Sequence, residues 1–251
     1  MAPPADTVLR GAHGARARFT TRHGGASVAP YDTLNLGDHV GDVPAAVAVN
    51  RARLLDSLAG EGLQRIAWLN QVHGVEVVDL DAWNGVEVPR ADAAVTTRAG
   101  LAACVLVADC LPVLLAAPGA VGAAHAGWRG LAGGVIERCA QALCDKAACS
   151  PAELQAWLGP AIGPRAFEVG DEVREAFVVS DAQASHAFLR LRAGYWLADL
   201  FMLARQRLRG FGVSAIHGDD ICTVSNPQDC YSFRRDRVCG RQAGLVWVPS
   251  R

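Results

Sequence analysis

The stretch over residues 105–134, VLVADCLPVLLAAPGAVGAAHAGWRGLAGG, constrains the fold of this chain more than any other. Its two apolar runs, separated by a short turn, are typical of strands buried inside a sheet, because strands covered on both faces read as continuous apolar runs. The first run ends at Cys110, and Pro112 predicts that the strand is broken just after this cysteine. The second run ends at His125, and a helix is expected to start near Gly130. The stretch therefore predicts buried strands that carry a thiol and an imidazole at their ends.

The segments around this stretch predict a mixture of helices and strands. Residues 43–60 have apolar side chains at helical spacing and end at a glycine, and residues 198–212 show the same pattern. Residues 75–80 alternate between apolar and polar side chains, as a half-buried strand does, whereas the glycine-rich and polar residues 22–42 are expected to form a loop. Strand and helix patterns follow one another without a repeat or a linker. The sequence therefore predicts an α/β fold, with one mixed-sheet domain packed with helices over residues 1–251.

Composition and charge limit the classes of partner. Of the 251 residues, 51% are apolar and 20% are charged, which is ordinary for a globular protein, and the net charge is -1. So small a charge gives no attraction to nucleic acid or to an anionic membrane. No apolar run approaches the roughly 18 residues of a membrane span, and the N-terminus lacks the apolar segment of a signal peptide. We therefore expect a cytoplasmic protein without nucleic-acid or membrane partners, as a monomer or a homodimer.

The eight cysteines do not indicate a disulfide framework. No two of them form a CxxC pair, and a chain of this length does not need disulfides to support its core. Most of the cysteines are therefore expected to be small buried apolar residues, or tolerated surface residues, in a reducing compartment.

The pair formed by Cys110 and His125 admits two chemical interpretations and a structural one. His125 can deprotonate Cys110 for attack on an acyl carbon, or both can bind zinc or copper, since thiolate and imidazole suit either ion. The structural interpretation makes Cys110 a core residue and His125 a hydrogen-bonded one, and buried cysteine is common. His73, at the end of another apolar run and before a glycine, adds a third candidate ligand. If the three strand ends meet at one sheet edge, they form a zinc site whose fourth position is open to water or substrate.

Polar residues elsewhere in the chain can serve an anionic or polar substrate. Arg129 is expected near the start of a helix, where free N–H groups and the helix dipole favour phosphate. Arg22 and Arg234 are further candidates for anion binding, although each arginine alone fits a solvated or structural role better. The side chains that can hydrogen-bond a sugar or base, or support the metal ligands, are Asn35, Asn70, Gln71, Asp92 and Asp109.

Several longer motifs resemble those of one protein family. In chain order between Phe19 and Trp247 they include TTRHGGASVAPYDTLNLGDHVGD, LNQVHG, ADAAVTT, ADCLPVLL, GAAHAGWRG, LGPAIGP, FEVGDEV, and YSFRRD followed by GRQAGLVW. On these motifs the chain resembles the bacterial YfiH-like proteins, also called the laccase-domain or multicopper polyphenol oxidase family. The motifs are specific together, although no single one is.

The resemblance implies a fold, a metal and a reaction. The fold is an α/β domain distantly related to the catalytic domain of cytotoxic necrotizing factor, and the metal is zinc held by His73, Cys110 and His125. The reaction is phosphorolysis of purine nucleosides, namely adenosine, inosine, guanosine and methylthioadenosine, with adenosine deamination beside it. Some members of the family are instead described as peptidoglycan editing factors, which hydrolyse a UDP-MurNAc-amino acid precursor. An older name makes the family copper polyphenol oxidoreductases.

Laccase chemistry fits the sequence least well. It needs several coppers held by many histidines, and this chain has seven histidines and no His-X-His pair. Copper can still replace zinc, because it binds such sites more tightly. We therefore predict a zinc-dependent purine nucleoside phosphorylase that takes a nucleoside and phosphate and also deaminates adenosine, with the precursor amidase and then the copper oxidoreductase as alternatives. The predicted catalytic residues are Cys110, His125, Arg129 and Asp109, and the predicted substrate-binding residues are Arg22, Asn35, Asn70, Gln71 and Arg234.

Overall fold

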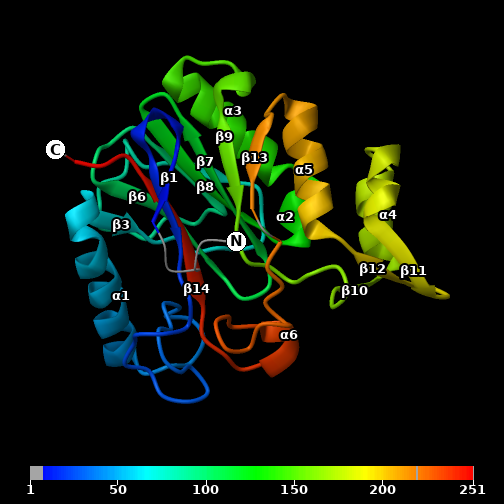
Figure 1. The fold of residues 1–251 in the computed structure, drawn as a ribbon, viewed down its shortest axis with the longest axis horizontal. Coiled ribbons are helices and arrows are strands. Elements are labelled where there is room, and N and C mark those ends of the chain that lie inside the picture. Colours follow the sequence, from blue (N-terminus) through cyan, green and yellow to red (C-terminus); the bar gives the residue numbers. More distant parts are fainter. Residues whose placement is uncertain (1–7, 219, 251) are drawn as a thin grey trace.

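The computed structural model describes residues 8–218 and 220–250, which form stacked layers of sheets and helices (Figure 1). A five-stranded sheet in the order β1-β2-β14-β6-β3 packs against a six-stranded sheet in the order β13-β9-β7-β8-β5-β4. Helix α1 covers the outer face of the first sheet, and helices α3 and α5 cover the outer face of the second. The predicted α/β fold with mixed sheets packed with helices is confirmed, while its confinement to one domain stays a prediction.

The strands of the five-stranded sheet are β1 (Leu9–Arg10), β2 (Arg16–Phe19), β14 (Gln242–Trp247), β6 (Leu101–Val107) and β3 (Arg65–Ala67). Those of the six-stranded sheet are β13 (Ala215–His217), β9 (Gln155–Leu158), β7 (Leu111–Ala117), β8 (Ala120–Ala126), β5 (Ala93–Thr96) and β4 (Val77–Asp79). A small third sheet contains β10 (Glu168–Gly170), β12 (Tyr195–Ala198) and β11 (Phe188–Arg192). The α-helices are α1 (Pro44–Leu58), α2 (Trp128–Gly133), α3 (Val135–Ala147), α4 (Asp171–Val178), α5 (Leu200–Phe211) and α6 (Phe233–Asp236).

Strand β7 is buried on both faces, as its continuous apolar run predicts. Leu114 faces the five-stranded sheet and packs in the core between the two sheets. Val113 and Leu115 face the other way and pack in the core under α3 and α5. The chain enters β7 from β6, which belongs to the other sheet, so residues 108–110 cross from one layer to the next. This crossing holds Cys110 at the end of the sandwich.

The structure corrects the interpretation of Pro112. The chain does break at Cys110, but Pro112 lies inside strand β7 as its second residue. It pairs with His125 of β8 and precedes Val113, where the pairing of β7 with β9 begins. Its missing N–H is therefore not needed by the β9 ladder, and a proline is tolerated at this end of a central strand.

The structure also corrects the predicted start of the helix after β8. Helix α2 begins at Trp128 rather than near Gly130, and it is interrupted at Gly134, whose φ of 91° separates it from α3. The small third sheet was not predicted, because its strands have only three to five residues, although β11 does alternate between leucine and arginine. None of the helices in the described residues is long and apolar enough to cross a bilayer.

We predict that Leu115→Ala lowers the free energy of unfolding by about 2–5 kcal/mol, because it opens a cavity in a fully buried core. Urea unfolding followed by circular dichroism measures the loss. Leu189→Ala is the matched control, because Leu189 is 69% exposed. A loss of equal size in the two variants would contradict the placement of β7 at the centre of the sandwich.

Candidate functional site

The three candidate ligands meet although they come from different parts of the chain. His73 lies between β3 and β4, Cys110 lies between β6 and β7, and His125 is the penultimate residue of β8. Their ligand atoms all lie within 4.8 Å of one another, and Cys110 Sγ is 3.8 Å from His73 Nε2. The predicted convergence is confirmed. Two of the ligands, however, come from connections that cross between the two sheets, rather than from strand ends of one sheet.

A buried carboxylate, Asp92, orients both histidines. Its Oδ1 accepts hydrogen bonds from His125 Nδ1 and from the backbone N–H of His73, both at 2.9 Å. Its Oδ2 accepts from the N–H groups of Val72 (3.1 Å) and Gly74 (2.7 Å). These bonds hold the turn in which His73 has a φ of 60°, and they direct the other ring nitrogen of His125 toward Cys110. A carboxylate behind a ligating histidine is the usual support of a metal site.

The side chains of Cys110, His125 and their polar neighbours also affect one another's protonation. Burial opposes ionisation of the Cys110 thiol, but the imidazoles of His125 and His73 outweigh it and lower the pKa of this thiol to about 6. Burial likewise opposes a charge on His125, yet Cys110 and Asp92 raise its pKa to about 9. Without a metal, the site therefore favours a thiolate beside an imidazolium at neutral pH. The thiolate is also the form that binds a metal ion.

The donor set and the space around it suit a zinc ion. One cysteine and two histidines are three of the four ligands that zinc takes, which leaves a position for water or substrate. Gly127 gives the ligands room, since a Cβ there would lie 3.0 Å from Cys110 Sγ and 3.1 Å from His73 Cδ2. In the motif HAGWRG this glycine therefore permits the approach of the ligands to each other.

The three ligands line a pocket of about 510 Å³. This volume is in the range of sites for small molecules, roughly 300–1,000 Å³. One part of the lining is apolar and aromatic, and it consists of Leu106, Trp128, Ile162, Phe167, Leu200 and Phe233. Another part is basic, and it consists of His39, Arg234, Arg237 and Arg241. The pocket therefore offers apolar and aromatic side chains and cationic groups beside the candidate metal ligands.

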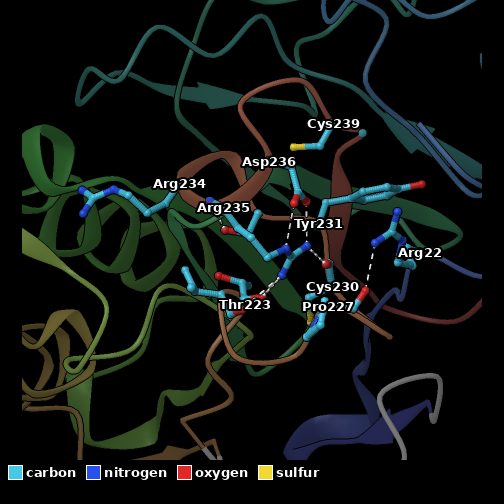
Figure 2. Close-up of polar contacts among 12 residues, drawn as sticks. Arg22, Thr223, Pro227, Cys230, Tyr231, Arg234, Arg235, Asp236 and Cys239 are labelled. Carbon is cyan, nitrogen blue, oxygen red and sulfur yellow. Dashed lines mark hydrogen bonds and ion pairs between the residues drawn. The ribbon is translucent and has the colours of Figure 1, made fainter. Parts of the chain in front are cut away.

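The segment that carries two of these arginines is anchored by Arg235 (Figure 2). The Arg235 guanidinium donates to the carbonyl oxygens of Thr223 (2.7 Å) and Cys230 (2.9 Å), and it forms an ion pair with Asp236 at 2.7 Å. These contacts fasten α6 to the chain at residues 223–230. Arg235 does not line the pocket, so its contacts hold in place the neighbours that do.

Asp109 and Arg234, two predicted site residues, both line the pocket and are bonded to each other. Asp109 Oδ1 accepts from Thr223 Oγ1 and its Oδ2 accepts from the backbone N–H of Arg234, both at 2.6 Å. The guanidinium of Arg234 donates to the carbonyl oxygen of Glu168 at 3.3 Å. In this structure Asp109 thus connects the crossing that holds Cys110 to the segment that holds the arginines.

Gln71 also lines the pocket, whereas Asn70 does not. The Gln71 amide donates to the carbonyl oxygen of Leu106 (2.9 Å) and accepts from its N–H (2.7 Å), which continues the edge of β6 as another strand would. Asn70 is exposed and pairs through its backbone with Arg90. Gln71 therefore shapes the pocket wall with both polar groups of its amide in use.

Three further predicted residues lie outside the pocket lining. The Arg22 guanidinium is bonded to two backbone carbonyls and one carboxylate, and one of these carbonyls is drawn in Figure 2. Asn35 is fully buried, and its Oδ1 accepts from the N–H of Arg241 at 2.8 Å. Arg129 is exposed, with its guanidinium 4.4 Å from the ring centre of Trp128. Their roles in binding stay predictions.

Sequence reasoning missed several residues of the pocket. Phe167, Leu200, Phe233, Arg237 and Arg241 were not predicted to belong to the site, although all of them line it. A signal was present, since Phe167 opens the motif FEVGDEV, Phe233 lies in YSFRRD and Arg241 lies in GRQAGLVW. These motifs carried the family resemblance without any role being assigned to them.

Comparison with known proteins decides the family. The pattern of the family described as multi-copper polyphenol oxidoreductase laccase matches residues 16–249. The chain belongs to this family. A Pseudomonas aeruginosa relative named purine nucleoside phosphorylase is 50% identical, with 93% of each chain covered. The Escherichia coli relative named purine nucleoside phosphorylase YfiH is 48% identical, with 94% of each chain covered.

A solved structure from the family has the same fold. The crystal structure of a Neisseria meningitidis protein superposes with a TM-score of 0.86 at 42% identity, and 99% of this chain and 96% of that chain are covered. The resemblance proposed from the motifs is thereby confirmed for family and fold. Among the residues that the structure describes, the group formed by His73, Cys110 and His125 is the one with the arrangement of a metal site.

We predict that, in chelator-treated protein, alkylation of Cys110 by iodoacetamide reaches half its maximal rate near pH 6. The reason is that the thiolate reacts, and the imidazolium of His125 keeps this thiolate stable down to that pH. Peptide mass spectrometry after pulses of reagent at different pH values measures the rate. In the His125→Ala variant the midpoint should move up toward the ordinary value of about 8.5. An unchanged midpoint in that variant would show that the two side chains do not interact.

We predict that Asp92→Asn raises the dissociation constant for zinc by about 10–100-fold, because the support of both histidines is weakened while all three ligands remain. Cys110→Ala, which removes a ligand, should lose nearly all bound zinc. Competition with a chromogenic chelator measures both constants. Asp79→Asn is the control, because Asp79 is a surface carboxylate whose ion pair is with Lys146. Wild-type zinc affinity in Asp92→Asn would rule out the supporting role of this carboxylate.

Proposed function

We propose that this protein is a zinc-dependent purine nucleoside phosphorylase. The observation that carries the proposal is the composition of one pocket, which is lined by the candidate metal ligands, by three aromatic side chains and by three arginines. A nucleoside and phosphate need those surfaces, namely a flat apolar one for the base and a cationic one for the anion. The names of the relatives at about half identity over nearly the whole chain support the same reaction.

Part of the pocket lining, which we call the aromatic wall, is suited to the purine ring. Trp128 and Phe167 are aromatic residues of this lining, and Ile162 and Leu200 add apolar surface to it. Phosphate would lie against Arg237 and against the side of the Arg241 guanidinium that does not bond to the carbonyl oxygens of Cys239 and Gly240. One guanidinium can donate two parallel hydrogen bonds to a phosphate. Both arginines line the pocket that also contains Cys110.

The chain's own groups can then promote phosphorolysis by holding the two reactants in contact. A phosphate oxygen forms a bond to the anomeric carbon of ribose as the bond from that carbon to the purine nitrogen breaks, and the departing base takes a proton. Arg237 and Arg241 hold the phosphate, while the aromatic wall fixes the base and so presents the anomeric carbon to it. A zinc ion held by His73, Cys110 and His125 would supply Lewis acidity to an oxygen or water in the pocket.

The finer parts of the proposal concern the substrates. We include adenosine, inosine, guanosine and methylthioadenosine as nucleosides, because the wall formed by Trp128 and Phe167 is apolar and favours no single purine edge. We also include deamination of adenosine, in which a water replaces the amino group of the base. Both reactions need the base to be held in the same pocket. Because phosphorolysis of adenosine gives adenine and deamination gives inosine, one chromatographic assay can distinguish them.

One observation favours a second candidate, an amidase acting on a nucleotide-linked cell-wall precursor. Cys110, His125 and Asp92 lie in the order thiol, imidazole and carboxylate. The His125 ring bonds to Asp92 at 2.9 Å, and Cys110 Sγ lies within 4.8 Å of a ring nitrogen of His125. Such a sequence of groups is also that of a cysteine nucleophile with its base and the group that orients the base. In that reaction the arginines would hold the diphosphate of the precursor.

We predict that purified protein with zinc converts inosine to hypoxanthine and ribose 1-phosphate only when phosphate is present. Liquid chromatography of the bases measures this conversion, and the same assay with adenosine separates adenine from inosine. Arg237→Ala should raise the KM for phosphate at least tenfold. Arg209→Ala, which removes an exposed arginine of α5 that does not line the pocket, should leave KM unchanged. No base release by zinc-loaded protein, together with amino acid release from the precursor, would favour the amidase instead.

A further inference from the structure

At the C-terminal end of helix α3, a turn brings Cys149 close to Cys144. Ala148 adopts the left-handed conformation with φ 48° and ψ 44°, and its N–H bonds to the carbonyl oxygen of Cys144. The N–H of Cys149 bonds to the same oxygen at 3.1 Å. In a helix end of this kind the residue after the left-handed one packs its side chain against the residue that accepts these bonds. Cysteines occupy both positions here.

The two thiols are neighbours that differ in exposure. The backbone bond between Cys149 and Cys144 brings their side chains together, Cys149 is close enough to raise the pKa of the Cys144 thiol, and both cysteines are free. Cys144 is buried at 6% exposure within the core under α3, whereas Cys149 packs at the edge of that core and is half-buried. Solvent therefore reaches one member of the pair, and the other lies directly behind it.

We propose that Cys144 and Cys149 form a reversible disulfide, so that the C-terminal end of α3 is an oxidisable dithiol site whose reactants are peroxides and small disulfides. The inference is independent of the proposed function. Helix α3 runs from Val135 to Ala147, and the cysteine pair lies at its C-terminal end. Neither cysteine lines the pocket of that site.

The reaction with hydrogen peroxide balances in two steps. The Cys149 sulfur attacks one peroxide oxygen, the O–O bond breaks, and the released hydroxide takes up a proton to become water, which leaves a sulfenic acid on Cys149. The Cys144 sulfur then attacks that sulfur, the S–S bond forms, the S–O bond breaks, and a second water leaves. Two electrons pass from the two thiols to one peroxide. A small dithiol such as dithiothreitol reduces this disulfide back to two thiols by thiol–disulfide exchange, and is itself oxidised.

The order of the two steps follows from the surroundings of each thiol. Burial and the neighbouring Cys149 raise the pKa of Cys144 to about 11, so little of its thiolate is present at neutral pH. The more exposed Cys149 is therefore the thiol that meets the oxidant. Cys144 acts second, when its partner has already become electrophilic.

The only lysine of the chain, Lys146, makes a direct test possible because it lies between the two cysteines. The full-length protein is treated with hydrogen peroxide, its remaining thiols are blocked with iodoacetamide under denaturing conditions, and it is digested with trypsin. We expect peptide 139–146 to be linked to peptide 147–165, and the linked pair to weigh about 2 Da less than the two peptides together. Dithiothreitol should separate them. The oxidised protein should also melt a few degrees higher, because the link restricts the unfolded chain.

Two variants complete the test. Cys149→Ser should abolish both the linked peptide and the rise in melting temperature. Cys139→Ser, which changes the other cysteine of peptide 139–146, should keep both. Recovery of Cys144 and Cys149 as separate alkylated peptides after oxidation would overturn the proposal. Oxidation of Cys149 to a sulfinic acid without a link to Cys144 would overturn it as well.

Discussion

The hydrogen bonds of the Asp92 carboxylate are the interaction on which the candidate site depends. A fully buried carboxylate is costly unless its oxygens are bonded, and Asp92 accepts four hydrogen bonds. Three come from the turn at residues 72–74 and one from the ring of His125. The same contacts that make this burial tolerable therefore hold the backbone of His73 next to His125 and fix the orientation of the His125 ring. Cys110 is the third candidate ligand. It lies close to His125 because residues 108–110 lead into β7, which pairs with β8.

The pocket is built where the two large sheets meet the C-terminal part of the chain. Connections between the sheets supply His73 and Cys110, while the segment from residue 223 to residue 241 supplies arginines and Phe233. Asp109 joins the connection after β6 to the C-terminal segment, since it bonds to Thr223 and Arg234. Within that segment, Arg235 bonds to the carbonyl oxygens of Thr223 and Cys230 (Figure 2).

The candidate site was predictable where residue type alone limits the role. A cysteine and two histidines at the ends of apolar runs have few uses, and the structure brings them within 4.8 Å. Arg22 and Asn35 were different, because an arginine or a buried amide can serve a ligand or the fold equally well. Arg22 bonds to Asp32 in the same loop but also to Pro227. Asn35 bonds to Gly37 but also to Arg241. No local pattern could show the contacts with residues 227 and 241.

By itself, the sequence determined the buried strands, the helices that cover the two large sheets, the family, and the three candidate ligands. These follow from apolar periodicity, from the metal chemistry of thiol and imidazole, and from motifs that are specific in combination. Tertiary structure alone decided that β6 and β7 belong to different sheets, that Asp92 joins two histidines, and that Arg237 and Arg241 face the same pocket as Cys110. The physical reason is that each of these features is a contact between segments far apart in the chain, which depends on how the layers pack.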